Sequence, residues 1–271
     1  MDERPIGLFD SGFGGLTVAR AVIDLLPNEN LVYIGDTGRY PYGPRPLSEV
    51  RRFARQITAK LVAEHDVKMV VVACNMAAAA GLDGLVAAPR TGVLSVVEPG
   101  VRAAIRATVS GRVGVIGTVG TVSSGAYQRV VAALDAERRV ELTCAACPGF
   151  VEFVERGETD SDQVYVLAER LLAPVQAAKV DTLLLGCTHY PFLARTISDV
   201  VGRDVVLVSS ADETAFELRS MLIDEGLTRE ESAAPTHTWI SSGDISTFRD
   251  LGRQLLGPEI DAVQAWEPAP I

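Results

Sequence analysis

Cysteine, histidine and long apolar runs are all scarce in this chain. Its 271 residues include four cysteines and three histidines, and no apolar stretch approaches the ~20 residues that a membrane helix needs. So few cysteines argue against a disulfide-based scaffold, and the first residues lack the pattern of a signal peptide. We therefore expect a cytoplasmic protein without a membrane span, whose cysteines are free thiols, metal ligands or catalysts.

Positive charge is also in short supply. The chain has 25 Lys and Arg against 35 Asp and Glu, which gives a formal net charge of −10. Binding of nucleic acid through bulk charge is excluded, because phosphate neutralisation needs clustered cations. An acidic protein can still bind a small anion at a helix N-terminus. The composition, 48% hydrophobic and 22% charged, is that of an ordinary globular protein.

Short apolar runs alternate with longer amphipathic segments along the chain. This pattern predicts strands at 5–9, 31–36, 68–73, 92–97, 112–117, 140–146, 182–186, 204–209 and 236–241. Helices are expected at 16–26, 48–65, from 75, 101–109, 123–134, 150–156, 162–178, from 192, 211–222 and 248–255. Such alternation indicates an α/β fold with mostly parallel sheets flanked by helices.

The alternating pattern starts again after Glu98, which predicts two similar α/β domains. We place the first domain at residues 1–97 plus 209–271 and the second at 98–208. In sheets of this kind, ligands bind beyond the carboxyl ends of the strands. Three predicted strands end in residues that can carry chemistry: PIGLF is followed by Asp10 and Ser11, VVVA by Cys74, and TLLLG by Cys187.

The glycine-rich segment DSGFGG at residues 10–15 follows the first predicted strand. Its glycines allow a tight turn that presents N–H groups at a helix N-terminus, although an ordinary strand-to-helix turn explains them equally well. The segment does not match G-x-G-x-x-G and no G-K-[ST] follows, so nucleotide binding is poorly supported.

Cys74 and Cys187 occur in similar settings far apart in the sequence. A single cysteine after a buried strand is usually a small hydrophobe. Here both precede a polar residue, Asn75 or Thr188, at the expected start of a helix, a place that lowers the pKa of a thiol. His189, two residues after Cys187, is a plausible proton partner.

Two such thiols suit a particular kind of chemistry. Nucleophilic catalysis needs one thiol, whereas inversion of a carbon centre needs an acid and a base on opposite faces of the substrate. Asp10 would tune Cys74, and His189 would tune Cys187. Cys144 and Cys147 form a C-A-A-C pair, but it ends a strand and runs into Pro148. We therefore expect a structural role for that pair and no metal site.

Five segments together resemble the cofactor-independent glutamate racemases, within the wider aspartate/glutamate racemase superfamily. They are FDSGFGGLTV (9–18), IGDTGRYPYG (34–43), VVACNMA (71–77), CPGFVEFVE (147–155) and LGCTHYP (185–191). The resemblance implies two α/β domains with the active site in the cleft between them, commonly in a homodimer. It also implies interconversion of L- and D-glutamate without a cofactor, in a bacterium that uses D-glutamate for peptidoglycan.

The resemblance further implies roles for individual residues. The catalytic residues would be Cys74, Cys187, Asp10, His189 and Glu155. The substrate-binding residues would be Asp10, Ser11, Tyr42, Gly43, Asn75, Met76, Thr188 and His189.

Met76 is the main departure from the family pattern, which usually has Thr or Ser after C-N. A thioether cannot donate the hydrogen bond of a hydroxyl, although the backbone N–H of Met76 can, and the lost donor weakens binding by ~1 kcal/mol. Two alternatives therefore stay open. One is a relative acting on aspartate, a hydantoin or another small carboxylate. The other is a weakly active homologue that binds glutamate or a protein partner.

Overall fold

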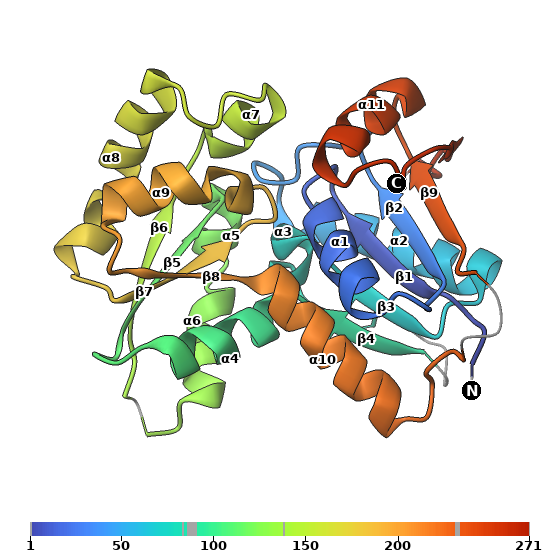
Figure 1. Cartoon of the computed structure of the whole chain (residues 1–271), viewed down its shortest axis with the longest axis horizontal. Coiled ribbons are helices and arrows are strands. Elements are labelled where there is room, and N and C mark those ends of the chain that lie inside the picture. The colour runs from blue at the N-terminus through green and yellow to red at the C-terminus, as the bar shows by residue number, and fades with distance from the viewer. Residues whose placement is uncertain (1, 83, 86–90, 138, 231–233, 271) are drawn as a thin grey trace.

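Two parallel sheets organise the molecule. The computed structural model describes residues 2–82, 84–85, 91–137, 139–230 and 234–270, and Figure 1 shows the two groups of strands side by side. The first sheet has the order β10-β9-β2-β1-β3-β4 and consists of Val263–Ala265, His237–Ser241, Leu31–Gly35, Ile6–Asp10, Met69–Val72 and Gly92–Ser95. The second has the order β6-β5-β7-β8 and consists of Glu141–Ala146, Arg112–Gly117, Thr182–Gly186 and Val206–Ser209.

All the strand pairings of the described residues are parallel. This confirms the predicted α/β fold with two sheets flanked by helices. The helices are α1 Leu16–Leu25, α2 Leu47–His65, α3 Asn75–Ala79, α4 Val97–Ala107, α5 Val119–Ser123, α6 Ala126–Leu134, α7 Phe150–Glu155, α8 Asp162–Ala177, the 3-10 helix η1 Tyr190–Leu193, α9 Ala194–Val201, α10 Ser210–Asp224 and α11 Ile245–Leu255. None of them is both long and apolar enough to cross a membrane.

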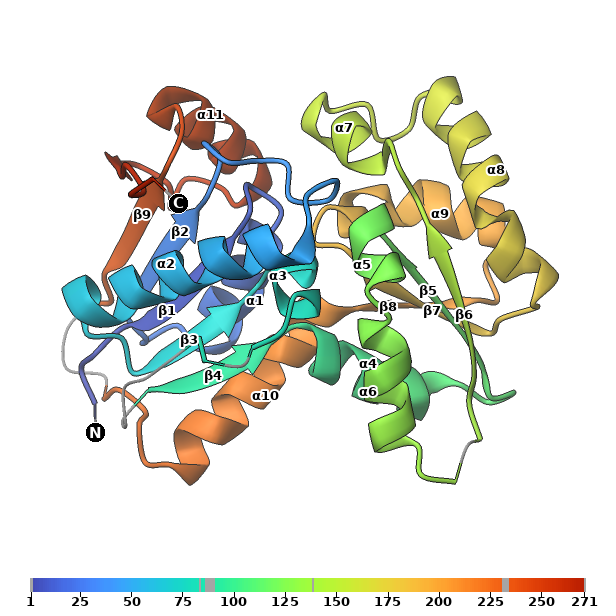
Figure 2. The same ribbon diagram turned by 180° about the vertical axis from the view of Figure 1, so that it is seen from behind.

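Alternate side chains of each strand enter different cores. In β1, Leu8 packs with α1 and α10 on one face of the first sheet, whereas Phe9 packs with α2 on the other. Figures 1 and 2 show these helices from opposite sides. The second sheet is likewise covered by α8 and α9 on one face and by α4 and α6 on the other. Burial on both faces explains why these strands are continuously apolar rather than alternating.

Four elements differ from the sequence-based expectation. The helix predicted at 123–134 begins as α6 only at Ala126, because Gly125 has a φ of 68° and separates it from α5, which the pattern missed. Helix α4 begins at Val97, inside the strand predicted at 92–97 and before the helix predicted at 101–109. The alanine-rich helix expected from Asn75 extends only to Ala79, and residues 83 and 86–90 lie outside the described residues. The pattern also missed β10, a strand of three residues that pairs with β9.

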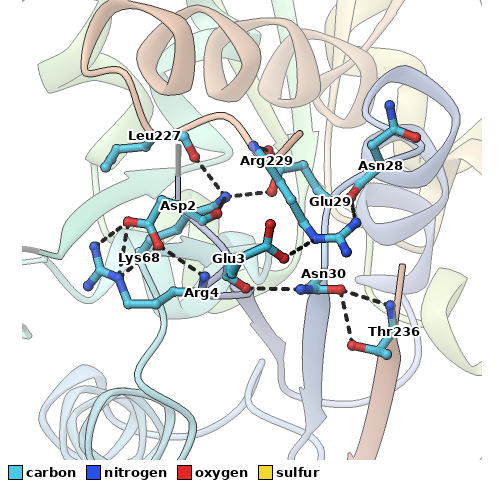
Figure 3. A network of polar contacts seen from close by, with 10 residues as sticks. All are labelled: Asp2, Glu3, Arg4, Asn28, Glu29, Asn30, Lys68, Leu227, Arg229 and Thr236. Carbon is cyan, nitrogen blue, oxygen red and sulfur yellow. Dashed lines mark hydrogen bonds and ion pairs between the residues drawn. The ribbon is translucent and has the colours of Figure 1, made fainter. Parts of the chain in front are cut away.

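A buried ion pair lies at the amino-terminal edge of the first sheet, within the network of Figure 3. The Lys68 ammonium donates to Glu29 Oε2 at 2.6 Å and to the carbonyls of Asp2 and Leu227 at 2.9 and 2.7 Å. The backbone N–H of Arg229 donates to the other Glu29 oxygen at 2.9 Å. The network therefore ties the amino-terminal segment to the chain that follows α10, far from the opposite edge where the strands end.

Candidate active site

A cavity of about 330 Å³ lies where the carboxyl ends of both sheets meet. Six connecting segments line it, and they follow β1, β2, β3, β5, β6 and β7. The lining residues are Ser11, Tyr40 to Pro44, Cys74 to Met76, Thr118, Val119, Thr121, Cys147 to Gly149, Val151, Glu152 and Gly186 to His189. Both predicted thiols therefore face one cavity, each from a different sheet.

Cys74 is the N-cap residue of α3 and is 4% exposed. Its sulfur accepts a hydrogen bond from the backbone N–H of Ala77 at 3.4 Å, and its S–H donates to Ser11 Oγ at 3.6 Å. Burial and the nearby charge of Asp10 nevertheless raise the pKa of Cys74 to about 12. The expectation that the helix start lowers the pKa of this thiol is therefore wrong, because desolvation outweighs the two hydrogen bonds.

Asp10 ends β1 directly behind the cavity wall. Its Oδ2 accepts a hydrogen bond from the backbone N–H of Gly12 at 2.9 Å. Its Oδ1 is buried and has no hydrogen-bond partner among the described residues. A 1% exposed carboxylate beside a buried thiol is an arrangement that favours the protonated form of the thiol.

A different set of groups surrounds Cys187. Its sulfur lies 3.9 Å from Nδ1 of His189, and Nε2 of His189 lies 3.3 Å from Oε1 of Glu155. Burial alone would lower the pKa of His189, but the contacts with Cys187 and Glu155 and the charge of Asp10 raise it to about 10. The raised pKa favours the protonated imidazole, which lies directly beside the Cys187 sulfur.

The residues expected to bind substrate are also brought together. Ser11, Tyr42, Gly43, Asn75, Met76, Thr188 and His189 line the cavity. Asp10 and Glu155 do not line it, but Asp10 immediately precedes Ser11 and Glu155 contacts His189, and both of these residues line the cavity. The side-chain amide of Asn75 donates to the Tyr127 hydroxyl at 2.8 Å, whereas its buried Oδ1 has no partner among the described residues.

Met76 contacts the part of the cavity wall that belongs to the second sheet. The hydroxyl of Thr121, which follows β5, donates to the Met76 sulfur at 3.8 Å. A Cβ on Gly120 would lie 2.5 Å from the Met76 methyl carbon, so the thioether fills the space against α5. The side chain at position 76 therefore accepts a weak hydrogen bond where a Thr or Ser hydroxyl could donate one.

Sequence reasoning missed several lining residues, notably Tyr40, Thr118, Thr121, Cys147 and Glu152. Thr118 and Cys147 directly follow β5 and β6, and Thr121 lies in α5. The rule that ligands bind beyond the strand ends applies to these strands too, and it could have found them. Cys147 is 1% exposed and lies in the wall. Burial and the neighbouring Cys187 raise its pKa to about 12.

No arrangement of three or more His, Cys, Asp or Glu side chains in the described ranges could hold a metal ion. The four cysteines are all free thiols. The cavity thus offers two thiols from different sheets, an imidazole and backbone or hydroxyl donors, with the buried carboxylate of Asp10 behind its wall. These groups can move protons to and from a small molecule bound between the thiols.

Comparison with known proteins shows the family to which this chain belongs. The model of the Asp/Glu/Hydantoin racemase family matches residues 16–217, and the chain belongs to that family of racemases. Among its curated relatives, a glutamate racemase from Parafrankia sp. (strain EAN1pec) is 51% identical over 264 residues, which cover 97% of this chain and 94% of the relative. Within the family, the chain therefore belongs with the glutamate racemases, as its motifs predicted.

Solved structures agree with this assignment. A glutamate racemase from Bacillus anthracis superposes with a TM-score of 0.91 at 39% identity, covering 99% of this chain and 98% of that one. A glutamate racemase from Francisella tularensis, solved in complex with D-glutamate, has a TM-score of 0.90 at 30% identity and covers 98% of both chains. The relatives thus share the two-sheet architecture over nearly the whole length of the chain.

Proposed function

We propose that this protein interconverts L- and D-glutamate, with Cys74 and Cys187 as the two acid/base groups. The observation that carries the proposal is that both sulfurs line one cavity from different sheets. A substrate held between them presents opposite faces of its Cα to the two thiols. One thiolate removes the Cα proton, and the opposite thiol delivers a proton to the other face of the carbanion.

The surroundings of the two thiols differ. Burial and the charge of Asp10 raise the pKa of Cys74, which favours its thiol form. The Cys187 sulfur instead lies 3.9 Å from Nδ1 of His189. In one direction of the reaction Cys187 accepts the proton from Cα while Cys74 donates its own, and proton exchange with solvent then returns both sulfurs to their starting state. In the other direction the two roles are exchanged.

Two features of the cavity support stabilisation of the carbanion. Asp10 and Glu155 act through Cys74 and His189, because neither lines the cavity. We propose that backbone N–H groups around Gly43, Asn75 and Thr188, which line the cavity, bind the substrate carboxylates, and that exclusion of water on binding strengthens these contacts. We further propose that the domains 1–97 plus 209–271 and 98–208 close over the substrate.

The test is a chiral assay on both glutamate enantiomers in deuterium oxide without added cofactor. Each product should carry deuterium at Cα, since the proton comes from a thiol that exchanges with solvent. Cys74→Ser and Cys187→Ser should each abolish racemisation, because a hydroxyl is far too weak an acid to replace a thiol. Racemisation retained by both variants would contradict the proposal.

Substrate choice needs its own experiment because of Met76. The same chiral assay against aspartate, a hydantoin and other small carboxylates distinguishes a glutamate enzyme from a relative with altered choice. Binding of glutamate in calorimetry without turnover would instead favour a weakly active homologue. The relatives named as glutamate racemases, at about half identity over the whole chain, favour glutamate.

Two further proposals follow from the family. D-Glutamate made here would enter peptidoglycan synthesis in the cytoplasm, which a depletion strain rescued by external D-glutamate would test. The chain would also form a homodimer, and light scattering should then give a mass twice that of the 28.9 kDa chain. A mass equal to one chain at assay concentration would exclude the dimer.

A further inference from the structure

The loop after β2 contributes more of the cavity wall than any other segment on the first sheet. Residues 40–44 line the cavity, and Tyr42 and Gly43 are among the expected substrate contacts. The hydroxyl of Tyr42 donates to Oδ2 of Asp36. What fixes this part of the wall is therefore the carboxylate of Asp36, which is 0% exposed.

Asp36 is in turn held by two residues outside the cavity. The Arg39 Nε donates to Asp36 Oδ2 at 2.8 Å, and the hydroxyl of Ser242 donates to Oδ1 at 2.6 Å. Ser242 follows β9. The Asp36 carboxylate therefore joins the loop between β2 and α2 (residues 36–46, the cavity loop) to the C-terminal part of the chain. A buried carboxylate with cationic and hydroxyl donors on both oxygens is a rigid attachment point.

The C-terminal tail, residues 266–270, covers the outer side of Arg39. The Arg39 guanidinium lies 4.2 Å from the ring centre of Phe53 and 5.6 Å from that of Trp266. Its Nη1 donates to the side-chain carbonyl of Gln56, whose amide donates to the backbone carbonyl of Ala269 at 3.0 Å. Two contacts therefore connect Arg39 to the tail: the ring of Trp266, and the hydrogen bonds through Gln56 to Ala269.

The tail itself is held to the rest of the chain at Trp266. The backbone N–H of Trp266 donates to the Ser241 carbonyl at 2.9 Å, directly after the β9–β10 pairing. The Trp266 ring packs on the core that contains Tyr42 and Phe53, and Lys60 Nζ lies 5.8 Å from its centre. Beyond it, Pro268, Ala269 and Pro270 face the cavity loop across a second hollow of about 350 Å³.

We propose that the C-terminal tail is a strap and that Trp266 is a positioning residue, which holds the cavity loop in its substrate-binding shape through Arg39 and Asp36. Trp266 does not line the cavity, so its influence on substrate passes through these two side chains. The kinetic test of this inference rests on the proposed function. A second test, by amide hydrogen exchange, depends only on the hydrogen bonds of the loop.

The kinetic test compares the intact protein with Trp266→Ala, Trp266→Phe and a deletion of residues 266–271. Trp266→Ala should raise the KM for glutamate about three- to fivefold while kcat changes less, because a cation–π contact and packing that fix the loop are lost. The deletion, which also removes the Gln56 bridge, should raise KM about tenfold. Trp266→Phe should restore most of the loss, because a ring remains over Arg39.

Glu267→Ala is the matched control, since it changes the next, exposed side chain of the tail. It should leave KM unchanged. A KM unaltered by the deletion, a change confined to kcat, or an equal effect of Glu267→Ala would overturn the strap.

Amide hydrogen exchange separates this result from failure of the proposed function. The backbone N–H groups of Gly38, Arg39 and Arg45 donate to Ser242 Oγ, Asp36 and Tyr42, at 3.0, 3.1 and 3.0 Å. In the deleted protein, exchange at 38–45 should accelerate at least tenfold while β3 and α8 stay protected. Uniform acceleration, or none, would overturn the strap whether or not the intact protein racemises glutamate.

Discussion

Gly14 offers a sharp test of how the imidazole beside Cys187 is positioned. A Cβ at this residue would lie 2.3 Å from Thr188 Oγ1 and 2.4 Å from His189 Nδ1, against 3.4–4 Å for ordinary contact. Its φ is not in the left-handed region, so alanine meets a steric problem and no backbone one. In Gly14→Ala the Thr188–His189 turn must therefore move by about 1 Å.

That displacement should break the contact between Cys187 and His189, which is already long. The Cys187 sulfur is already 3.9 Å from His189 Nδ1, and a misplacement of 1 Å at a reacting centre costs about 10²-fold in rate. Because each direction of the reaction uses both thiols, kcat should fall about 10²-fold with either glutamate enantiomer as substrate. Circular dichroism of glutamate, followed from each enantiomer, measures both rates.

Gly114→Ala is the control for general crowding. Its Cβ would lie 2.7 Å from a Leu183 methyl in the core of the second sheet, away from the cavity. Both variants should lose stability, by roughly 1–3 kcal/mol, but only Gly14→Ala should lose activity. A folded Gly14→Ala protein with normal kcat in both directions would refute the reasoning that His189 must stay against Cys187.

Three further predictions rest on other contacts. Met76→Thr should lower the KM for glutamate about three- to tenfold, because a hydroxyl donor replaces a thioether that accepts from Thr121; an unchanged KM in the chiral assay would count against it. Lys68→Met should lower the free energy of unfolding by about 3–5 kcal/mol and leave kcat unchanged, since Glu29 is then buried without its cation. Urea titrations should show much of that loss recovered in the double variant Lys68→Met with Glu29→Leu. The pKa of His189 is raised from 6.5 to about 10 in the folded chain, so its contribution to stability is complete below pH 6.5 and disappears as pH rises through 10. His189→Gln should accordingly flatten the decline of stability between pH 6.5 and 9, and an identical slope in the variant would contradict this assignment.

The sequence predicted the strands better than the helix ends, for a physical reason. The central strands β1, β2 and β3 of the first sheet are buried along their whole length, so their apolar runs are unbroken and easily recognised. The helix predicted at 123–134 begins late, at Ala126, because a glycine inside a helical pattern does not reveal whether its φ is positive. The three residues of β10 carry no apolar pattern, since they are mostly exposed and form the edge of the sheet.

The site could be predicted where a reactive side chain directly follows a strand and belongs to a recognisable motif. Cys74 and Cys187 could be paired because each follows an apolar run. Thr118 and Thr121 follow β5 in the same way but carry ordinary side chains, so nothing in the sequence singles them out. Their role in the wall depends on how closely the two sheets approach, which is set by packing between segments distant in the chain.

The pKa of Cys74 shows why the failed expectation is informative. A helix start favours a thiolate, but burial and Asp10 raise the pKa of this thiol to about 12. Cys187 occupies a similar strand end and instead contacts His189. Two segments that look alike in sequence thus place their sulfurs in different surroundings, one near a buried carboxylate and one beside an imidazole. The proposed mechanism can use such a difference, because an acid and a base must be present together before either can act.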